Sequence, residues 1–126
     1  MYDHLNPGNS PMPGYTQTVK VPAGADWLVI SGQVGVDAKG KLASGVRKQA
    51  DQVFRNLLAC LRANGMRKKD LVKFTVYLTD SRFIGDYRAS RARHIGEAVL
   101  PTSTLVIVDG LASPDMLLEI EAWAAR

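Results

Sequence analysis

Two strand-like segments close the chain, Pro101-Thr-Ser-Thr-Leu-Val-Ile-Val108 and Leu117-Leu-Glu-Ile-Glu-Ala-Trp-Ala124. Alternate residues of a strand point to opposite faces, so the second segment has one purely apolar face. Its other face carries two glutamates together with Leu117 and Trp123. A face meant only for water does not usually carry such large apolar side chains. We therefore expect something outside the monomer to cover this face, and Glu119 is the first candidate for chemistry.

Two helices and another strand are predicted before these segments. Apolar residues at steps of three and four predict a helix that starts at the N-cap Ser44 and ends at Asn64-Gly65. Strict alternation predicts a strand over Leu71–Thr79. Asp80 or Ser81 is then expected to cap a second helix that runs to Gly96.

A hairpin is expected nearer the N-terminus. The patterns of Thr16–Val21 and Trp27–Ser31 predict two strands joined by a turn. Residues 1–14 are rich in proline and glycine, which predicts a loop or arm. The resulting order of elements predicts a single α+β domain over residues 1–126, with both helices on one face of a sheet. No predicted element covers the other face, so self-association through it is expected.

Composition excludes several classes of function. The hydrophobic content of 46% and charged content of 22% are typical of a globular protein. The apolar runs are too short for a membrane span and no signal-peptide pattern is seen, so no membrane partner and a cytoplasmic location are expected. The net charge of +4 comes without the interleaving of aromatic and basic residues that stacking platforms use, so a nucleic-acid partner is not expected.

Metal and disulfide chemistry are not expected. His4 and His94 lie far apart in sequence, with no cysteine or carboxylate at ligand spacing. The single cysteine, Cys60, lies within the first helical pattern, where it is expected to act as a small buried hydrophobe.

Four short motifs, in this order and spacing, resemble those of the YjgF/RidA family, whose older name refers to an L-PSP endoribonuclease. They are Ile30-Ser-Gly-Gln33, Gly65 followed by Asp70-Leu-Val-Lys-Phe-Thr-Val-Tyr-Leu-Thr-Asp80, Pro101-Thr-Ser-Thr104 and Glu119-Ile-Glu-Ala122. The resemblance implies a chorismate-mutase-like fold with one mixed sheet, assembled as a homotrimer with a small-molecule cleft between subunits. It also implies hydrolysis of enamines and imines without a cofactor.

The resemblance assigns roles to particular residues. Glu119 matches the glutamate that positions the attacking water, and Tyr15 and Ser31 match residues that line the cleft. A further lining position falls on Asp86 or Tyr87, between which the sequence does not decide.

One position departs from the pattern of the imine-hydrolysing branch. Ser103 stands where that branch has the arginine that holds the substrate carboxylate. A hydroxyl offers one hydrogen bond where a guanidinium offers two charge-assisted ones, so imines derived from amino acids are expected to be poor substrates. Arg88 or Arg91 of the second helix is the alternative source of a cation, if these side chains are more than surface charges.

Three functions remain open from the sequence. The first is an imine or enamine hydrolase of altered or reduced activity, in which Glu119 acts on water, unless this carboxylate is only structural. The second is a non-catalytic trimer that binds a small ligand through Ser103, Thr104 and Glu119. The third is a ribonuclease, which lacks a histidine pair or metal cluster to act as acid and base.

Overall fold

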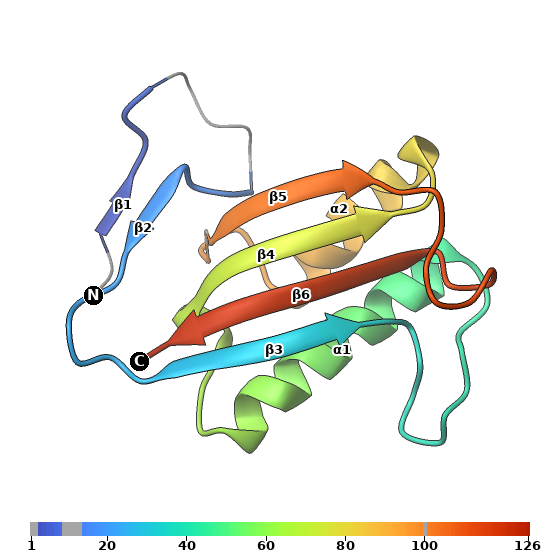
Figure 1. The fold of residues 1–126 in the computed structure, drawn as a ribbon, viewed down its shortest axis with the longest axis horizontal. Coiled ribbons are helices and arrows are strands. Elements are labelled where there is room, and N and C mark those ends of the chain that lie inside the picture. The colour runs from blue at the N-terminus through green and yellow to red at the C-terminus, as the bar shows by residue number, and fades with distance from the viewer. Residues whose placement is uncertain (1–2, 9–13, 100) are drawn as a thin grey trace.

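A mixed four-stranded sheet forms the body of this computed structural model, which describes residues 3–8, 14–99 and 101–126. The strands lie in the order β3 (Trp27–Gln33), β6 (Leu118–Ala125), β4 (Leu71–Leu78) and β5 (Thr102–Ile107). The pair β4 and β5 is parallel, and the other pairs are antiparallel (Figure 1). The predicted α+β fold with a mixed sheet is therefore confirmed.

Both long helices cover the same face of this sheet, as expected (Figure 1). Helix α1 (Val46–Ala63) buries an apolar stripe against the sheet, and α2 (Ile84–His94) packs beside it. The core between the layers centres on Phe54 of α1 and Phe74 of β4, whose rings meet edge to face. Two short 3₁₀ turns, η1 (Lys68–Asp70) and η2 (Ser81–Phe83), precede β4 and α2. No helix in the described ranges is long and apolar enough to cross a membrane.

The ends of the helices lie close to the predicted positions. The N-cap of α1 is Gly45, at φ 82°, and not Ser44, because the chain enters the helix through a left-handed conformation that suits glycine. At the other end Gly65 has φ 69°, as expected for a glycine that follows a helix. Asp80 caps η2 by accepting a hydrogen bond from the backbone N–H of Arg82.

The predicted N-terminal hairpin is wrong. Strand β2 (Thr18–Lys20) pairs with β1 (Asp3–Leu5) in a separate two-stranded ribbon, whereas β3 pairs with β6. Leu28 and Ile30 pack against the core, which requires β3 to lie in the main sheet, and β2 has no comparable pair of apolar side chains to bury. Part of the expected arm is thus a strand, and its residues 1–2 and 9–13 lie outside the described residues.

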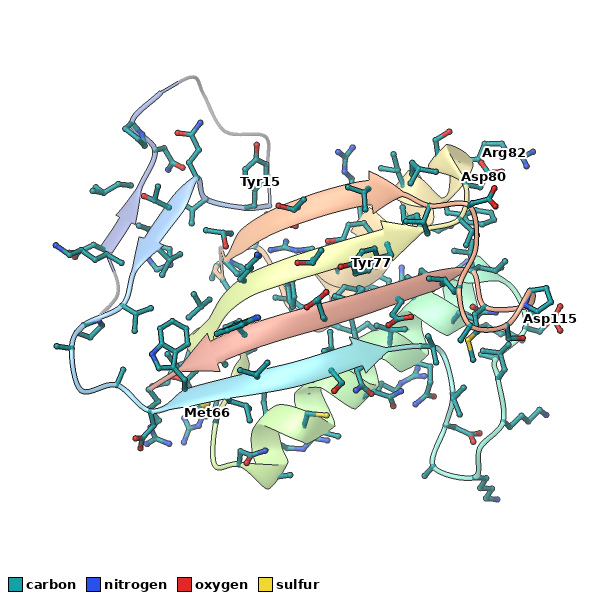
Figure 2. All side chains as sticks on the ribbon, in the orientation of Figure 1. Tyr15, Met66, Tyr77, Asp80, Arg82 and Asp115 are labelled. Carbon is teal, nitrogen blue, oxygen red and sulfur yellow. The ribbon has the colours of Figure 1, made fainter. Side chains whose placement is uncertain are left out.

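The sheet face away from the helices, here called the open face, has no cover from the described part of the chain. Trp123 of β6 and Trp27 of β3 meet edge to face on it, with ring centroids 5.8 Å apart, and both are substantially exposed. Val29 of β3 is also exposed. Figure 2 shows Tyr77 of β4 on the same face. The predicted alternation of β6 is confirmed, because Leu118, Ile120, Ala122 and Ala124 are all buried on the helix side.

Asp51 of α1 joins the two helices. Its carboxylate accepts hydrogen bonds from the Ser90 hydroxyl at 2.6 Å and from Arg93 at 2.8 Å, and it lies 3.1 Å from Nε2 of His94. Burial alone would raise the pKa of Asp51, but these three bonds together outweigh burial and lower the pKa from 3.8 to about 2.

Asp51→Asn is expected to lower the free energy of unfolding at neutral pH. A carboxylate with a depressed pKa stabilises the fold above its unfolded-state pKa, and this contribution disappears as pH falls from 3.8 to about 2. Urea unfolding at a series of pH values should therefore show a gap between variant and unmodified protein that closes in this window. Asp86→Asn, at an exposed position on α2, is the control. A gap of constant size at every pH would contradict the assignment.

Candidate functional site

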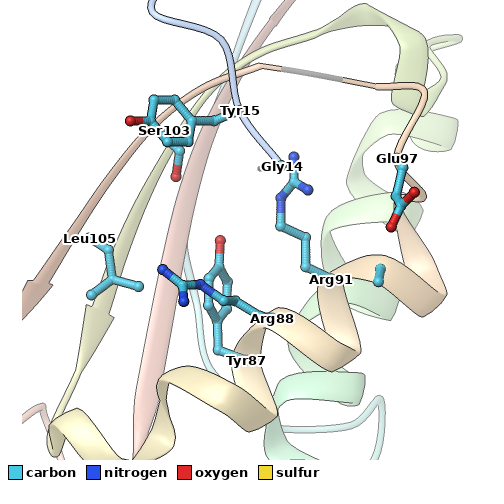
Figure 3. Close-up of a pocket in the computed structure, with 9 residues that line it drawn as sticks. Gly14, Tyr15, Tyr87, Arg88, Arg91, Glu97, Ser103 and Leu105 are labelled. Atoms are coloured by element: carbon cyan, nitrogen blue, oxygen red, sulfur yellow. The ribbon is translucent and has the colours of Figure 1, made fainter. Parts of the chain in front are cut away.

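A pocket of about 390 Å³ lies between α2 and the edge strand β5 (Figure 3). Ser103 and Leu105 line it from β5, and the segment that enters β2 contributes Gly14 and Tyr15. The remaining lining residues come from α2 and the turn after it: Tyr87, Arg88, Arg91, Ala92 and Glu97. Hydroxyls and guanidinium groups from three separate segments therefore meet in one cavity.

Strand geometry places Ser103 inside this pocket and Thr104 outside it. Successive side chains of a strand point to opposite faces, and Leu105, two residues after Ser103, packs against the core on the helix side. Thr104 is exposed and is not among the lining residues. The two hydroxyls that the sequence paired as ligand contacts thus lie on opposite faces of β5.

Tyr87 is the most deeply buried hydroxyl group of the pocket. Its side chain is buried against Phe54, and its hydroxyl points toward Ser103 (Figure 3), with which it interacts by a hydrogen bond. Burial raises the pKa of Tyr87 and outweighs the lowering by Arg91, Ser103 and Arg88. The hydroxyl therefore stays protonated at neutral pH and can donate a hydrogen bond. Of the two alternatives left open, Tyr87 lines the pocket, whereas Asp86 is exposed outside it.

Arg91 projects into the pocket from α2 (Figure 3). The residue is only 7% exposed, and its guanidinium lies 5.9 Å from the centroid of the Phe74 ring. Burial lowers the pKa of Arg91, and the neighbouring Tyr87 partly offsets that effect. Arg88 lines the same pocket with an exposed side chain. Of the two readings given to these residues, cleft lining and surface charge, the structure favours cleft lining for Arg91.

Glu119 lies elsewhere, on the open face of β6. In the register of the sheet it lies opposite Tyr77 of β4. It is half-buried because it leans over Gly32 of β3, where a Cβ atom would meet Oε2 of Glu119 at 1.9 Å. Glycine at this position, beside a register shift of β3, is thus what lets the carboxylate lie flat against the sheet. Its neighbour on the same face, Glu121, accepts a hydrogen bond of 2.7 Å from the Tyr77 hydroxyl.

The predicted site residues therefore form two groups within one chain. Tyr15, Tyr87 and Ser103 line the pocket, whereas Glu119 lies on the open face and Ser31 is exposed on β3 beside Gly32. β3 and β5 are opposite edges of the sheet, three strand spacings or about 14 Å apart. A single chain does not bring the two groups into one cavity.

Sequence reasoning missed Glu97, Gly14 and Leu105 of the pocket. Glu97 lies in the turn after α2, where no periodic pattern marks it. Gly14 has φ 93°, and a Cβ there would approach the Arg91 guanidinium to 3.1 Å. Leu105 was detectable, because it shares the face of Ser103 two residues on. The described residues contain no cluster of His, Cys, Asp and Glu that could hold a metal ion.

Residues 8–126 match the family described as Endoribonuclease L-PSP. A RutC family protein of Pyrococcus horikoshii is 36% identical, over 94% of this chain and 93% of its own length. A 2-iminobutanoate/2-iminopropanoate deaminase of Salmonella typhimurium is 35% identical, over 79% of each chain. Among solved structures, a conserved Rid family protein of Yersinia pestis has a TM-score of 0.87 at 28% identity and covers 99% of this chain and 98% of its own. RidA of an Antarctic Psychrobacter has a TM-score of 0.76 at 32% identity, with coverage of 93% and 92%.

Proposed function

Because the chain belongs to the Endoribonuclease L-PSP family, which is the YjgF/RidA family that its motifs resemble, we propose that it hydrolyses the C=N bond of imines in a cleft completed by a second copy. Enamines become substrates once they tautomerise to imines. The observation that carries this proposal is the separation of the two residue groups. Glu119 rests on Gly32 on the open face, and the hydroxyl-lined pocket lies between α2 and β5.

Assembly of identical chains would bring the two groups of residues together in one cleft. The open face carries Glu119 together with the exposed side chains of Trp27, Val29 and Trp123. Contact with another chain would remove these apolar side chains from water. A neighbouring copy that packs against this face places its own pocket near that carboxylate. We propose a homotrimer, in which each cleft takes Glu119 and Ser31 from one subunit and Tyr15, Tyr87 and Ser103 from the next.

The chemistry needs few groups. Water adds to the imine carbon, a C–O bond forms, and the nitrogen leaves as ammonia when the C–N bond of the adduct breaks, so an imine and water give a carbonyl compound and ammonia. Glu119, as a carboxylate, accepts a hydrogen bond from the attacking water and takes its proton, which then passes to the nitrogen so that ammonia can leave. Tyr87 and Ser103 donate hydrogen bonds to the substrate. The ring of Tyr15 and the side chain of Leu105 exclude bulk water from one side of the pocket.

The way in which the anionic group of a substrate is held should differ from that in the deaminases of the family. Ser103 offers a single hydroxyl on β5, so the position of the anionic group of a substrate is not fixed from this strand. The proposed activity is therefore C=N hydrolysis with an altered mode of substrate binding, and the chain needs no cofactor for it.

An assay with imines formed in place tests the proposal. An amino-acid oxidase generates the imine, and semicarbazide competes with the protein for it. We expect the unmodified protein to lower semicarbazone formation in proportion to its concentration. Lys68 is exposed in η1, so the Lys68→Ala variant should lower semicarbazone formation to the same extent. No effect on any imine of a panel of oxidase substrates would contradict the hydrolase and favour the ligand-binding alternative, which the single hydroxyl of Ser103 supports.

A further inference from the structure

The buried guanidinium of Arg91 is incompletely partnered. Its Nη2 donates to the carbonyl of Val99 at 3.3 Å, which is a long hydrogen bond. Its Nε is buried and has no hydrogen-bond partner among the described residues. Ion pairs in the described ranges involve Arg82, Arg93 and His94, and none joins Arg91 to a carboxylate. A buried charge without an anionic partner destabilises a fold, and an anionic ligand that pairs with Arg91 would offset this cost.

The surroundings of Arg91 suit an anion of modest size. Arg88 lies one turn away on α2 and lines the same pocket, and both cations act on Tyr87. The protonated Tyr87 hydroxyl and the Ser103 hydroxyl supply hydrogen-bond donors. The single acidic lining residue, Glu97, is exposed. Two guanidinium groups and two hydroxyls therefore converge in one cavity (Figure 3).

We propose that Arg91, assisted by Arg88, binds the carboxylate of the substrate from α2, in place of a cation on β5. This inference rests on the proposed hydrolysis of imines and names their class: imines of carboxylic acids. The guanidinium of Arg91 donates to the carboxylate from the side of the cavity that it lines, and Ser103, being small, leaves room on the β5 side for the rest of the substrate.

This reverses the expectation that Ser103 makes amino-acid-derived imines poor substrates. That expectation considered β5 alone, because the sequence does not show that Arg91 turns into the same cavity. With a guanidinium already present on α2, an added arginine at position 103 gives little benefit. It places a third positive charge near Arg88 and Arg91 and removes the hydroxyl that interacts with Tyr87.

Calorimetric titration of the assembled protein tests the site directly. The probe is 2-oxobutanoate, the hydrolysis product of 2-iminobutanoate, and butanone is the neutral analogue that lacks the carboxylate. We expect 2-oxobutanoate to bind and Arg91→Gln to weaken its binding roughly tenfold to hundredfold, the usual contribution of one charge-assisted hydrogen bond. Arg88→Gln, at an exposed position that tolerates substitution, is expected to weaken it several-fold. Arg93→Gln on the same helix, whose side chain bonds to Asp51, is the matched control and should leave binding unchanged.

Three results would overturn the assignment. The first is that butanone binds as tightly as 2-oxobutanoate. The second is that Arg91→Gln and Arg88→Gln bind 2-oxobutanoate as tightly as Arg93→Gln does. The third is that inorganic phosphate binds more tightly than 2-oxobutanoate, which would assign the site to a phosphate ligand. Circular dichroism shows whether the Arg91→Gln variant folds. If it does not fold, the affinity of Arg88→Gln for 2-oxobutanoate tests the assignment.

Kinetics separate this inference from the proposed function. If Arg91 holds the carboxylate, Arg91→Gln raises KM for an imino acid more than it lowers kcat, and Ser103→Arg gains no more than a few-fold in kcat/KM. If Arg91→Gln leaves hydrolysis unchanged and Ser103→Arg raises kcat/KM strongly, the proposed hydrolase activity stands and the carboxylate site on α2 is wrong. Carboxylate binding that depends on Arg91, with no hydrolysis, would keep the site and overturn the hydrolase.

Discussion

Glu119→Gln is expected to lower the rate of imine hydrolysis by about 10²- to 10⁴-fold, the usual contribution of a positioned general base. The amide keeps the shape of the side chain and its place over Gly32, but it cannot take a proton from water. Because Glu119 is proposed to act on water while Arg91 holds the carboxylate, binding of 2-oxobutanoate should change much less than the rate of hydrolysis. The semicarbazide competition assay and the calorimetric titration measure the two effects separately.

Glu121→Gln is the matched control for this substitution. Glu121 lies on the same strand and the same face, two residues away, but its carboxylate is engaged by the Tyr77 hydroxyl. Activity within about twofold of the unmodified protein is expected there, as for substitutions away from a site. Equal losses in both variants would show that the face matters only for structure or assembly.

Gly32→Ala tests the placement of Glu119 without changing its chemistry. The added methyl would meet the carboxylate at 1.9 Å, so the carboxylate must swing away from β3. Because the displaced atoms are the end of a flexible side chain, the fold should survive while activity falls. Activity equal to that of the unmodified protein would mean that the position of Glu119 over Gly32 is not the catalytic one.

Local patterns in the sequence were sufficient to predict the layers of the fold. The apolar stripe of α1 and the alternation in β4 and β6 each repeat over many residues, so burial fixes both their type and their inward face. The pairing of β2 depended on which neighbour could bury its side chains. Thr18–Lys20 is short and mostly exposed, and such a strand pairs with β1 or β3 equally well by pattern.

The site was harder to predict because its members come from different elements. The two faces of β5 follow from period two, so the separation of Ser103 from Thr104 was available in the sequence. The direction of the Arg91 side chain could not be predicted from the sequence. Helix α2 has arginines at positions 88, 91 and 93, and too few apolar residues to show which face points inward. Arg93 turns to Asp51 and Arg91 to the pocket, a difference that only the packing of α2 against α1 and β5 decides.

Trp123→Ala is expected to weaken assembly by about 3–5 kcal/mol per subunit, the usual cost of truncating a buried tryptophan, which corresponds to a roughly hundredfold or larger rise in the dissociation constant. The open face carries Trp123 in contact with Trp27, and both rings are substantially exposed in the single chain. Truncation should therefore affect the stability of the isolated chain less than it affects association.

Light scattering during size-exclusion chromatography, over a dilution series, measures this effect. The unmodified protein should elute as a trimer and Trp123→Ala as smaller species at the same concentration, whereas Lys68→Ala, in the exposed turn η1, should elute as the trimer. If the cleft takes Glu119 from one subunit and the Arg91 pocket from another, as proposed, hydrolysis in Trp123→Ala should fall with dilution in step with the trimer fraction. A monomer that hydrolyses imines at full rate would contradict the shared cleft, because the two groups lie on opposite faces of one chain.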